Sequence, residues 1–269
     1  MKYYNAYDKL QDSISRSGSM LCVGLDSDIS KLPVGFEKSI NGLLEFNKSI
    51  IKATSQVAAA YKINFAFYEQ YGSDGFDLLK NTFEIIPENI FTIADAKRGD
   101  IGNTSLAYAR SVFDFFEADS VTINPYMGFD SIEPFLEYKN KFVFLLALTS
   151  NKGSYDFQRL DVAGRPLYQH IVEKTLKNYS NKNIGFVVGA THPDELAALR
   201  RVAEDSCFLI PGVGAQGADV DAVTTANNKK LALINVSRAI IYPETQNSYK
   251  TFEDLVQDAA VSYWEKMRL

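Results

Sequence analysis

The sequence contains little histidine and little cysteine, with two of each in 269 residues. His170 and His192 stand far apart in different helical regions, so a histidine-based metal site is not expected. Cys22 and Cys207 lie inside apolar runs without CxxC spacing, and we interpret them as buried free thiols. The sequence therefore predicts no histidine-based metal site and no disulfide.

The sequence also lacks long apolar runs and an excess of basic charge. No run approaches the roughly 18 apolar residues needed to span a bilayer. Residues 1–11 have neither the cationic start nor the apolar stretch of a signal peptide. The formal net charge of -5 gives no general reason to expect nucleic acid or an anionic membrane as partner, because both favour a basic face. We therefore expect a cytoplasmic protein with no nucleic-acid or membrane partner.

Short apolar runs rich in β-branched residues recur along the chain and alternate with segments of helical periodicity. This alternation is typical of a parallel sheet covered by helices, and eight such units predict a closed (β/α)8 barrel. No linker divides the chain, so we predict one α/β domain over residues 1–269, a TIM barrel with a short N-terminal helix. The predicted strands are 20–25, 58–64, 90–94, 120–124, 142–148, 184–189, 207–211 and 231–236. The clearest predicted helices are 36–53, 103–116, 165–178, 193–204 and 251–265.

Polar side chains follow most of the predicted strands. In a barrel of this kind the active site lies on the face formed by the carboxyl ends of the strands. Polar loops are common, but polar residues at six of eight strand ends indicate one shared site. The residues are Asp26, Lys62, Asn64, Asp95, Lys97, Asn124, Thr149, Ser150, Ser237 and Arg238.

Two segments near the end of the chain predict a phosphate site. The sequence PGVGAQG at 211–217 follows the seventh strand, and its glycines allow backbone N–H groups to approach an anion. Arg238 follows the eighth strand and offers a guanidinium for bidentate pairing. The loops after strands seven and eight are the common phosphate site of such barrels. A plain tight turn is the alternative for 211–217.

The third predicted strand ends in a cluster of charged residues. Residues two apart on a strand face the same way, so Asp95 and Lys97 are expected to point into the barrel mouth as an ion pair. Lys62 can approach Asp95 from the adjacent strand, while Asp100 lies beyond a glycine turn and need not share its direction. In such a set every charge has an oppositely charged neighbour, as a desolvated site requires. It also places a lysine where it can donate a proton. A carboxylate repels an anionic substrate group beside it, and this repulsion is lost when that group leaves as neutral carbon dioxide. The alternative is a surface salt-bridge cluster.

Six segments, in order, resemble the orotidine 5'-monophosphate decarboxylases. They are GLD at 24–26, YKIN at 61–64, DAKRGDIGNT at 95–104, LTSN at 148–151, PGVGAQ at 211–216 and SR at 237–238. The resemblance covers nearly the whole chain, and the third segment is similar to the longer bacterial forms. It implies a cofactor-free carboxy-lyase that converts orotidine 5'-monophosphate to UMP and carbon dioxide, the last step of de novo pyrimidine nucleotide synthesis.

The resemblance implies a role for each residue that faces the base and the ribose. Lys97 would donate a proton to C6 of the pyrimidine after carbon dioxide leaves, and Asp95 would lie against the departing carboxylate. Lys62 would bind the ribose hydroxyls and orient Asp95. Asp26 would hold a ribose hydroxyl, and Ser150 would contact the pyrimidine.

The resemblance also implies how the phosphate is held and how the chain assembles. Gln216 and Arg238 would bind the phosphate. The family residues that match Asp100, Ile101 and Thr104 enter the neighbouring subunit's site, so a homodimer with two shared active sites is expected.

Two other functions remain open. Magnesium-dependent sugar-phosphate decarboxylases and aldolases of the same superfamily also carry DxKxxD, but they have an acidic residue at the position of Lys62, where a cation would repel Mg²⁺. A non-catalytic barrel that binds a phosphate ligand would keep Gly214, Gln216 and Arg238. Such a barrel would not need an internal proton donor such as Lys97.

Overall fold

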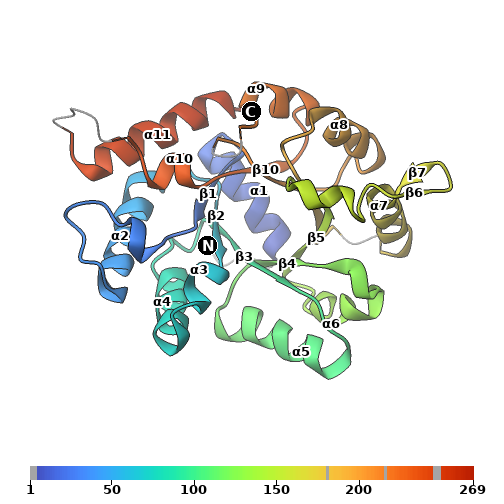
Figure 1. Ribbon diagram of the computed structural model, residues 1–269, viewed down its shortest axis with the longest axis horizontal. Helices are drawn as coiled ribbons and strands as arrows, with labels where there is room; N and C mark the ends of the chain where they lie inside the picture. Colours follow the sequence, from blue (N-terminus) through green and yellow to red (C-terminus); the bar gives the residue numbers. More distant parts are fainter. Residues whose placement is uncertain (1–4, 180–181, 215–216, 245–249) are drawn as a thin grey trace.

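The computed structural model describes residues 5–179, 182–214, 217–244 and 250–269. Its parallel strands close into a barrel in the order β1-β10-β9-β8-β5-β4-β3-β2, and helices surround the barrel (Figure 1). The predicted (β/α)8 fold is confirmed, and each predicted strand overlaps one barrel strand. The barrel strands are β1 (Leu21–Leu25), β2 (Ala60–Asn64), β3 (Phe91–Arg98), β4 (Ser120–Ile123), β5 (Phe142–Leu148), β8 (Ile184–Val188), β9 (Phe208–Pro211) and β10 (Ala232–Val236).

The helices follow the prediction, with some differences at their ends. The helix predicted from residue 36 begins four residues later, because the Ser39 side chain accepts the backbone N–H of Gly42 and caps it there. The helix predicted over 103–116 ends earlier and continues as a π-helix, Ser111–Phe115. The helices are α1 (Ala6–Ser17), α2 (Ile40–Thr54), α3 (Ala66–Glu69), α4 (Gly72–Glu84), α5 (Gly102–Arg110), α6 (Glu133–Leu136), α7 (Leu167–Asn178), α8 (Pro193–Val202), α9 (Val220–Ala226), α10 (Arg238–Ile241) and α11 (Phe252–Lys266).

The connection between β5 and β8 contains a small hairpin. Its strands, β6 (Asp161–Val162) and β7 (Arg165–Pro166), pair antiparallel and precede α7. Figure 1 shows this hairpin projecting from the barrel at the side of α7. The prediction did not include it, because two-residue strands carry too little periodicity to be detected in a sequence.

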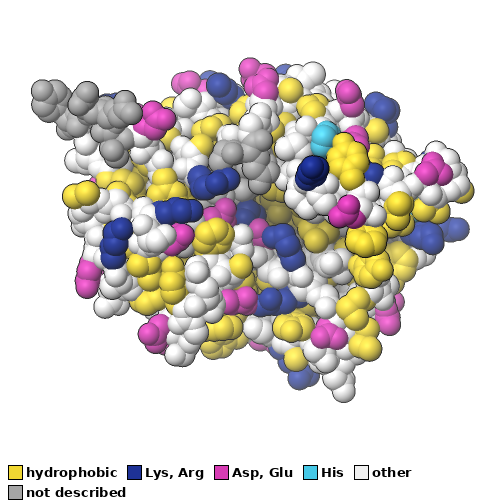
Figure 2. Space-filling model, in the orientation of Figure 1, with side chains coloured by type: hydrophobic (Ala, Val, Ile, Leu, Met, Phe, Trp, Pro, Cys, Tyr) yellow, Lys and Arg dark blue, Asp and Glu magenta, His cyan; other side chains and the backbone are white. Residues whose placement is uncertain are grey.

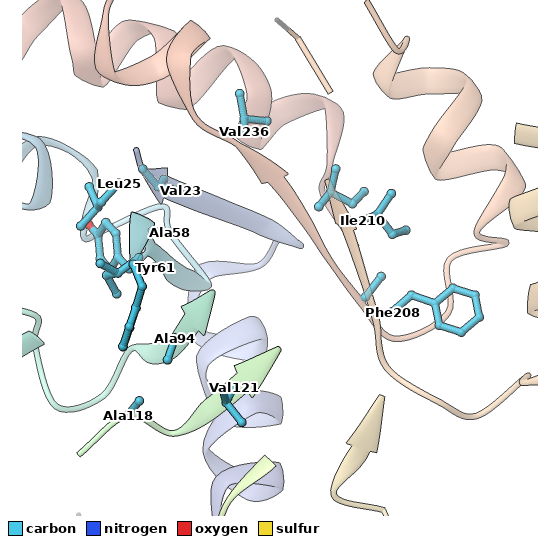
Figure 3. Close-up of a cluster of buried hydrophobic side chains, with 14 of the residues drawn as sticks. Val23, Leu25, Ala58, Tyr61, Ala94, Ala118, Val121, Phe208, Ile210 and Val236 are labelled. Atoms are coloured by element: carbon cyan, nitrogen blue, oxygen red, sulfur yellow. The ribbon is translucent and has the colours of Figure 1, made fainter. Parts of the chain in front are cut away.

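The outer faces of the strands pack against the surrounding helices. Apolar residues of neighbouring strands form one large buried cluster with helix residues. Figure 3 shows part of it, including Val23 and Leu25 of β1, Tyr61 of β2 and Ile210 of β9. Burial of both faces of every strand explains why the strands are nearly continuous apolar runs in the sequence.

The inward-facing side chains change character along the barrel axis. Near the amino ends of the strands they are apolar and form a second buried cluster, which includes Cys22, Phe91 and Phe144. Leu10 and Ile14 of α1 belong to the same cluster, so α1 closes this end of the barrel. Nearer the carboxyl ends the inward positions turn polar. The barrel therefore has one sealed apolar end and one polar end.

An ion pair fastens α1 to the barrel. Lys9 Nζ lies 2.7 Å from Asp119 Oδ2, which also accepts the backbone N–H and the hydroxyl of Thr92 on β3. The Asn5 side chain caps the start of α1, and Gly18 ends the helix in the left-handed conformation at φ 63°.

Two further predictions can be compared with the described residues. Cys22 and Cys207 are both buried and unpaired, as predicted. In the described part of the chain, every helix is too short or too polar to cross a membrane. The assignment of residues 1–269 to a single domain stays a prediction.

Candidate active site

A cavity of about 370 Å³ opens among the carboxyl ends of the barrel strands. This volume lies in the range of small-molecule sites, roughly 300–1,000 Å³. Figure 2 shows acidic and basic side chains gathered around a hollow in the middle of this face. The polar lining residues are Asp26, Lys62, Asn64, Asp95, Lys97, Thr122, Thr149, Ser150, Asn151, Asn235, Ser237 and Arg238. The other lining residues are Leu146, Val187, Leu209, Pro211, Gly212 and Val213.

The carboxylate of Asp95 is the centre of the charged network. Asp95 is 8% exposed. Its Oδ2 lies 2.7 Å from Lys62 Nζ, and its Oδ1 lies 2.6 Å from Lys97 Nζ and 3.0 Å from Thr122 Oγ1. Lys62 Nζ also lies 3.5 Å from Asp26 Oδ1. Each carboxylate oxygen of Asp95 thus faces one ammonium group, as a buried charge requires.

The same contacts shift the pKa values of the buried pair. Burial pushes the pKa of Asp95 upwards, but the ammonium groups of Lys62 and Lys97 outweigh burial and hold it well below its usual range. Burial pushes the pKa of Lys62 downwards, and the carboxylates of Asp26 and Asp95 outweigh that effect and raise it. Asp95 is therefore an anion and Lys62 a cation at neutral pH.

Lys97 reaches Asp95 from an irregular backbone. The prediction placed Asp95 and Lys97 on one face by regular strand alternation. The two side chains do meet, but the β3–β4 register shifts between Ala94 and Arg98, and Lys97 has φ 48°. A positive φ is uncommon for a residue with a Cβ atom. The geometric reason given in the prediction is therefore wrong, although the predicted ion pair is present.

The segment after Lys97 is fixed by its neighbours. Arg98 forms an ion pair with Glu69 on α3 and lies over the ring of Tyr108, 5.2 Å from the centroid. Gly99 approaches the backbone of Asn124 closely, because a Cβ there would lie 2.9 Å from the Asn124 carbonyl oxygen. These contacts fix the path of the chain where it leaves the barrel after β3.

Three predicted site residues lie away from the cavity. Asp100, Ile101 and Thr104 do not line it, and Ile101 and Thr104 are exposed at the start of α5. Asp100 Oδ1 accepts the backbone N–H of Ile101 at 2.8 Å. Within one chain these residues do not form part of the cavity, so their predicted role in a partner subunit's site stays a prediction.

The predicted phosphate residues divide between described and undescribed positions. Arg238 lines the cavity at the start of α10, beside Ser237. Gly212 lines it from the loop after β9 with φ 109°, a conformation that favours glycine. Gln216 lies outside the described residues. Of the predicted site residues, the structure thus brings Asp26, Lys62, Asp95, Lys97, Ser150 and Arg238 to one cavity.

Sequence reasoning missed Thr122 and Asn235 and misplaced Asn124. Thr122 and Asn235 line the cavity from inside β4 and β10, while Asn124 does not line it and caps the short helix after β4 by accepting the Tyr126 N–H. The cavity is lined not only by strand ends but also by inward-facing positions one or two residues earlier. Their polar character inside otherwise apolar strands was the available signal.

The loop that carries Ser150 is held through its neighbour Thr149 and by Gly189. The Gln158 side chain accepts the Thr149 N–H and donates to the Thr149 hydroxyl, both at 2.8 Å. Gly189, after β8, packs against Ser150 so closely that a Cβ there would lie 2.7 Å from the Ser150 backbone nitrogen. The loop after β5 therefore enters the cavity in a fixed position.

A comparison with protein families shows which family the chain belongs to. A family described as "Orotidine 5'-phosphate decarboxylase / HUMPS family" matches residues 19–249. The chain belongs to this family. An orotidine 5'-phosphate decarboxylase of Dehalococcoides mccartyi is 47% identical over 249 residues, which are 90% of this chain and 90% of that protein. By this likeness the chain is a carboxy-lyase.

Solved structures are similar over nearly the whole chain. The OMP decarboxylase of Leishmania donovani has a TM-score of 0.85 and 37% identity, and the match covers 98% of this chain and 97% of that one. The UMP synthase of Leishmania donovani has a TM-score of 0.87 and 39% identity over 98% of this chain. The match covers 56% of the UMP synthase, so this chain spans little more than half of that protein.

Proposed function

We propose that this chain decarboxylates orotidine 5'-monophosphate to UMP and carbon dioxide without a metal or an organic cofactor. The observation that carries the proposal is the Lys62–Asp95–Lys97 network at the cavity, in a chain whose relatives bear this enzyme's name. This reaction would be the last step of de novo pyrimidine nucleotide synthesis.

The network supports a simple course for the chemistry. Asp95 is anionic, so a substrate carboxylate placed beside it is destabilised in the ground state, and its departure as neutral carbon dioxide relieves the repulsion. The bond between C6 and the carboxylate carbon breaks, and its electron pair remains on C6. Lys97 Nζ then donates a proton to C6, which gives UMP, and the amine regains a proton from solvent.

The remaining lining residues support binding of the nucleotide. Arg238 and the backbone around Gly212 would bind the phosphate, with Gln216 as a further donor. Lys62 and Asp26 would bind the ribose hydroxyls, and Ser150 the pyrimidine. Phosphate binding far from C6 would supply energy that positions the base in a water-poor site, where charges act more strongly.

We further propose that the enzyme acts as a homodimer with shared sites. Ile101 is 54% exposed beside the charged segment, although it is a large apolar residue. Tyr126, Met127 and Phe157, in loops after β4 and β5, are exposed as well. A second copy that covers these side chains would bring Asp100, Ile101 and Thr104 to the partner's cavity.

A magnesium-dependent reaction of the same superfamily is the second candidate. Lys62 argues against it, because its ammonium group occupies one carboxylate oxygen of Asp95 at 2.7 Å and would repel a divalent cation. Within the described residues, no group of three or more His, Cys, Asp or Glu side chains is arranged to hold a metal ion.

The test is incubation of the purified protein with orotidine 5'-monophosphate in the presence of EDTA. We expect UMP and carbon dioxide in equal amounts, at the rate measured without EDTA. Loss of activity with EDTA and recovery with Mg²⁺ would favour the magnesium-dependent candidate. Binding of UMP without any turnover would favour a non-catalytic phosphate-binding barrel.

A further inference from the structure

Thr122 contacts both members of the Asp95–Lys97 pair. It is 1% exposed and lies on β4. Its hydroxyl donates to Asp95 Oδ1 at 3.0 Å and accepts the backbone N–H of Lys97 at 3.0 Å. A hydroxyl has one donor hydrogen and two acceptor lone pairs, so it can make both bonds at once. One buried side chain therefore links the carboxylate to the backbone of the predicted proton donor.

The bond to Lys97 lies where the sheet is irregular. Ala94 pairs with Val121 and Arg98 pairs with Ile123, so β3 advances four residues while β4 advances two. Lys97 lies in this bulge with φ 48°. A left-handed conformation is disfavoured for lysine and persists only when surrounding contacts hold it. The Thr122 hydroxyl is one of those contacts, since it receives the Lys97 N–H within the bulge.

The Lys97 side chain has few other restraints. It is 49% exposed, and its stem is flexible. The position of the ammonium group therefore depends on the contacts at the two ends of the side chain. At one end the backbone N–H bonds Thr122, and at the other the ammonium bonds Asp95, which itself bonds Thr122. Thr122 thus acts on both ends of the side chain.

We propose that Thr122 is a positioning residue for decarboxylation, which sets the location of the Lys97 ammonium and the orientation of the Asp95 carboxylate. This inference rests on the proposed function of those two residues. Valine has nearly the same shape and an equal preference for strands, so packing alone does not require a hydroxyl here. A buried hydroxyl is costly unless it is bonded, and these two bonds account for its presence.

The test compares Thr122→Val with Thr122→Ser. We expect Thr122→Val to lower kcat about 10- to 100-fold and to leave KM within about 3-fold, because an interaction with charged reacting groups is lost while nucleotide contacts remain. Thr122→Ser keeps the hydroxyl and should retain kcat within about 3-fold. The matched control is Thr175→Val on α7, where a buried hydroxyl bonds its own helix at Ile171 O, and kcat should be unchanged.

Three results would overturn the proposal. The first is an unchanged kcat in Thr122→Val, and the second is a rise in KM of that variant without a fall in its kcat. The third is a fall in kcat of Thr122→Ser as large as that of Thr122→Val. Should Thr122→Val fail to fold in a thermal melt, Thr122→Ala replaces it with the same expected loss of kcat. A wild-type protein without decarboxylase activity would contradict the proposed function, and crystal structures would then decide the positioning role. The hydroxyl-free variant should show Lys97 with a changed φ or its ammonium displaced from Asp95, and unchanged geometry would refute the role.

Discussion

Lys97 is the residue on which the proposed chemistry depends most. We expect Lys97→Ala to lower kcat by about 10³-fold or more, because a positioned proton donor contributes about 10²–10⁴-fold and Asp95 also loses a partner. Binding of UMP should remain within about 10-fold of wild type, since the proposed phosphate contacts, Arg238 and the backbone around Gly212, do not involve Lys97. Steady-state kinetics and calorimetric titration measure the two quantities. Lys52→Ala, an exposed lysine on α2, is the control. Substantial turnover in Lys97→Ala would remove the proton-donor role.

Asp95 links the site to the stability of the fold. Its pKa is lower in the folded chain than in the unfolded chain, where it is about 3.9. The anion therefore stabilises the fold fully above that pH, and this contribution is lost as the pH falls below it. We expect Asp95→Asn to unfold at lower denaturant concentration than wild type at pH 7. The difference between the two proteins in the urea concentration at the midpoint of unfolding should become smaller at and below about pH 4. A difference that does not change with pH would exclude a contribution from the ionised carboxylate.

The sequence was informative at residues where charge stands out and less so at neutral polar residues. Lys62, Asp95 and Lys97 could be predicted because charged side chains at the ends of apolar strands have few structural explanations. Thr122 was missed because threonine is an ordinary strand residue, and only its partners reveal its place in the site.

At the scale of elements, the alternation of strands and helices predicted the barrel, because burial on both faces makes each strand apolar. The irregularity in β3 could not be predicted in the same way. A bulge depends on register with β4 and on contacts such as Thr122 with Lys97, which are distant in sequence. The short hairpin β6–β7 was missed because its strands are too brief to show a period.

The junction of β8 with the loop after β5 offers a test at this scale. In Gly189→Ala the new methyl group would lie 2.7 Å from the nitrogen and 3.0 Å from the Cα of Ser150, so the loop must move. We expect a loss of about 1–3 kcal/mol in the free energy of unfolding and a higher KM, because Ser150 is displaced from the cavity. Denaturant titration and kinetics measure these effects.

Gly164→Ala is the contrasting variant. Gly164 has φ 80° in the β6–β7 hairpin, and a Cβ there meets no atom within 4 Å. Alanine should reduce stability through backbone strain and leave KM unchanged, because no neighbour is displaced. An equal rise in KM in both variants would show that close packing against Ser150 is not the cause.

At the scale of the whole molecule, the two ends of the barrel differ in character. Leu10 and Ile14 of α1 close the apolar end, and Lys9 fastens the helix to Asp119. The polar end carries the cavity. There Asp95 is paired with Lys62 and Lys97, whereas Ile101, at the start of α5, is exposed and does not line the cavity. A second copy of the chain packed against the start of α5 would cover this large apolar side chain.

A shared site can be tested by mixing two inactive variants. Lys97→Ala and Asp100→Ala would each damage both sites of a homodimer, provided that Asp100 acts in the partner's cavity. After subunit exchange, half of the dimers contain one chain of each kind, and one of the two sites in these dimers has native Lys97 and native Asp100. We expect activity to rise to about a quarter of the wild-type value. Each variant exchanged with itself is the control. If Asp100 acts in its own chain, every site in the mixture carries one substitution and no activity returns.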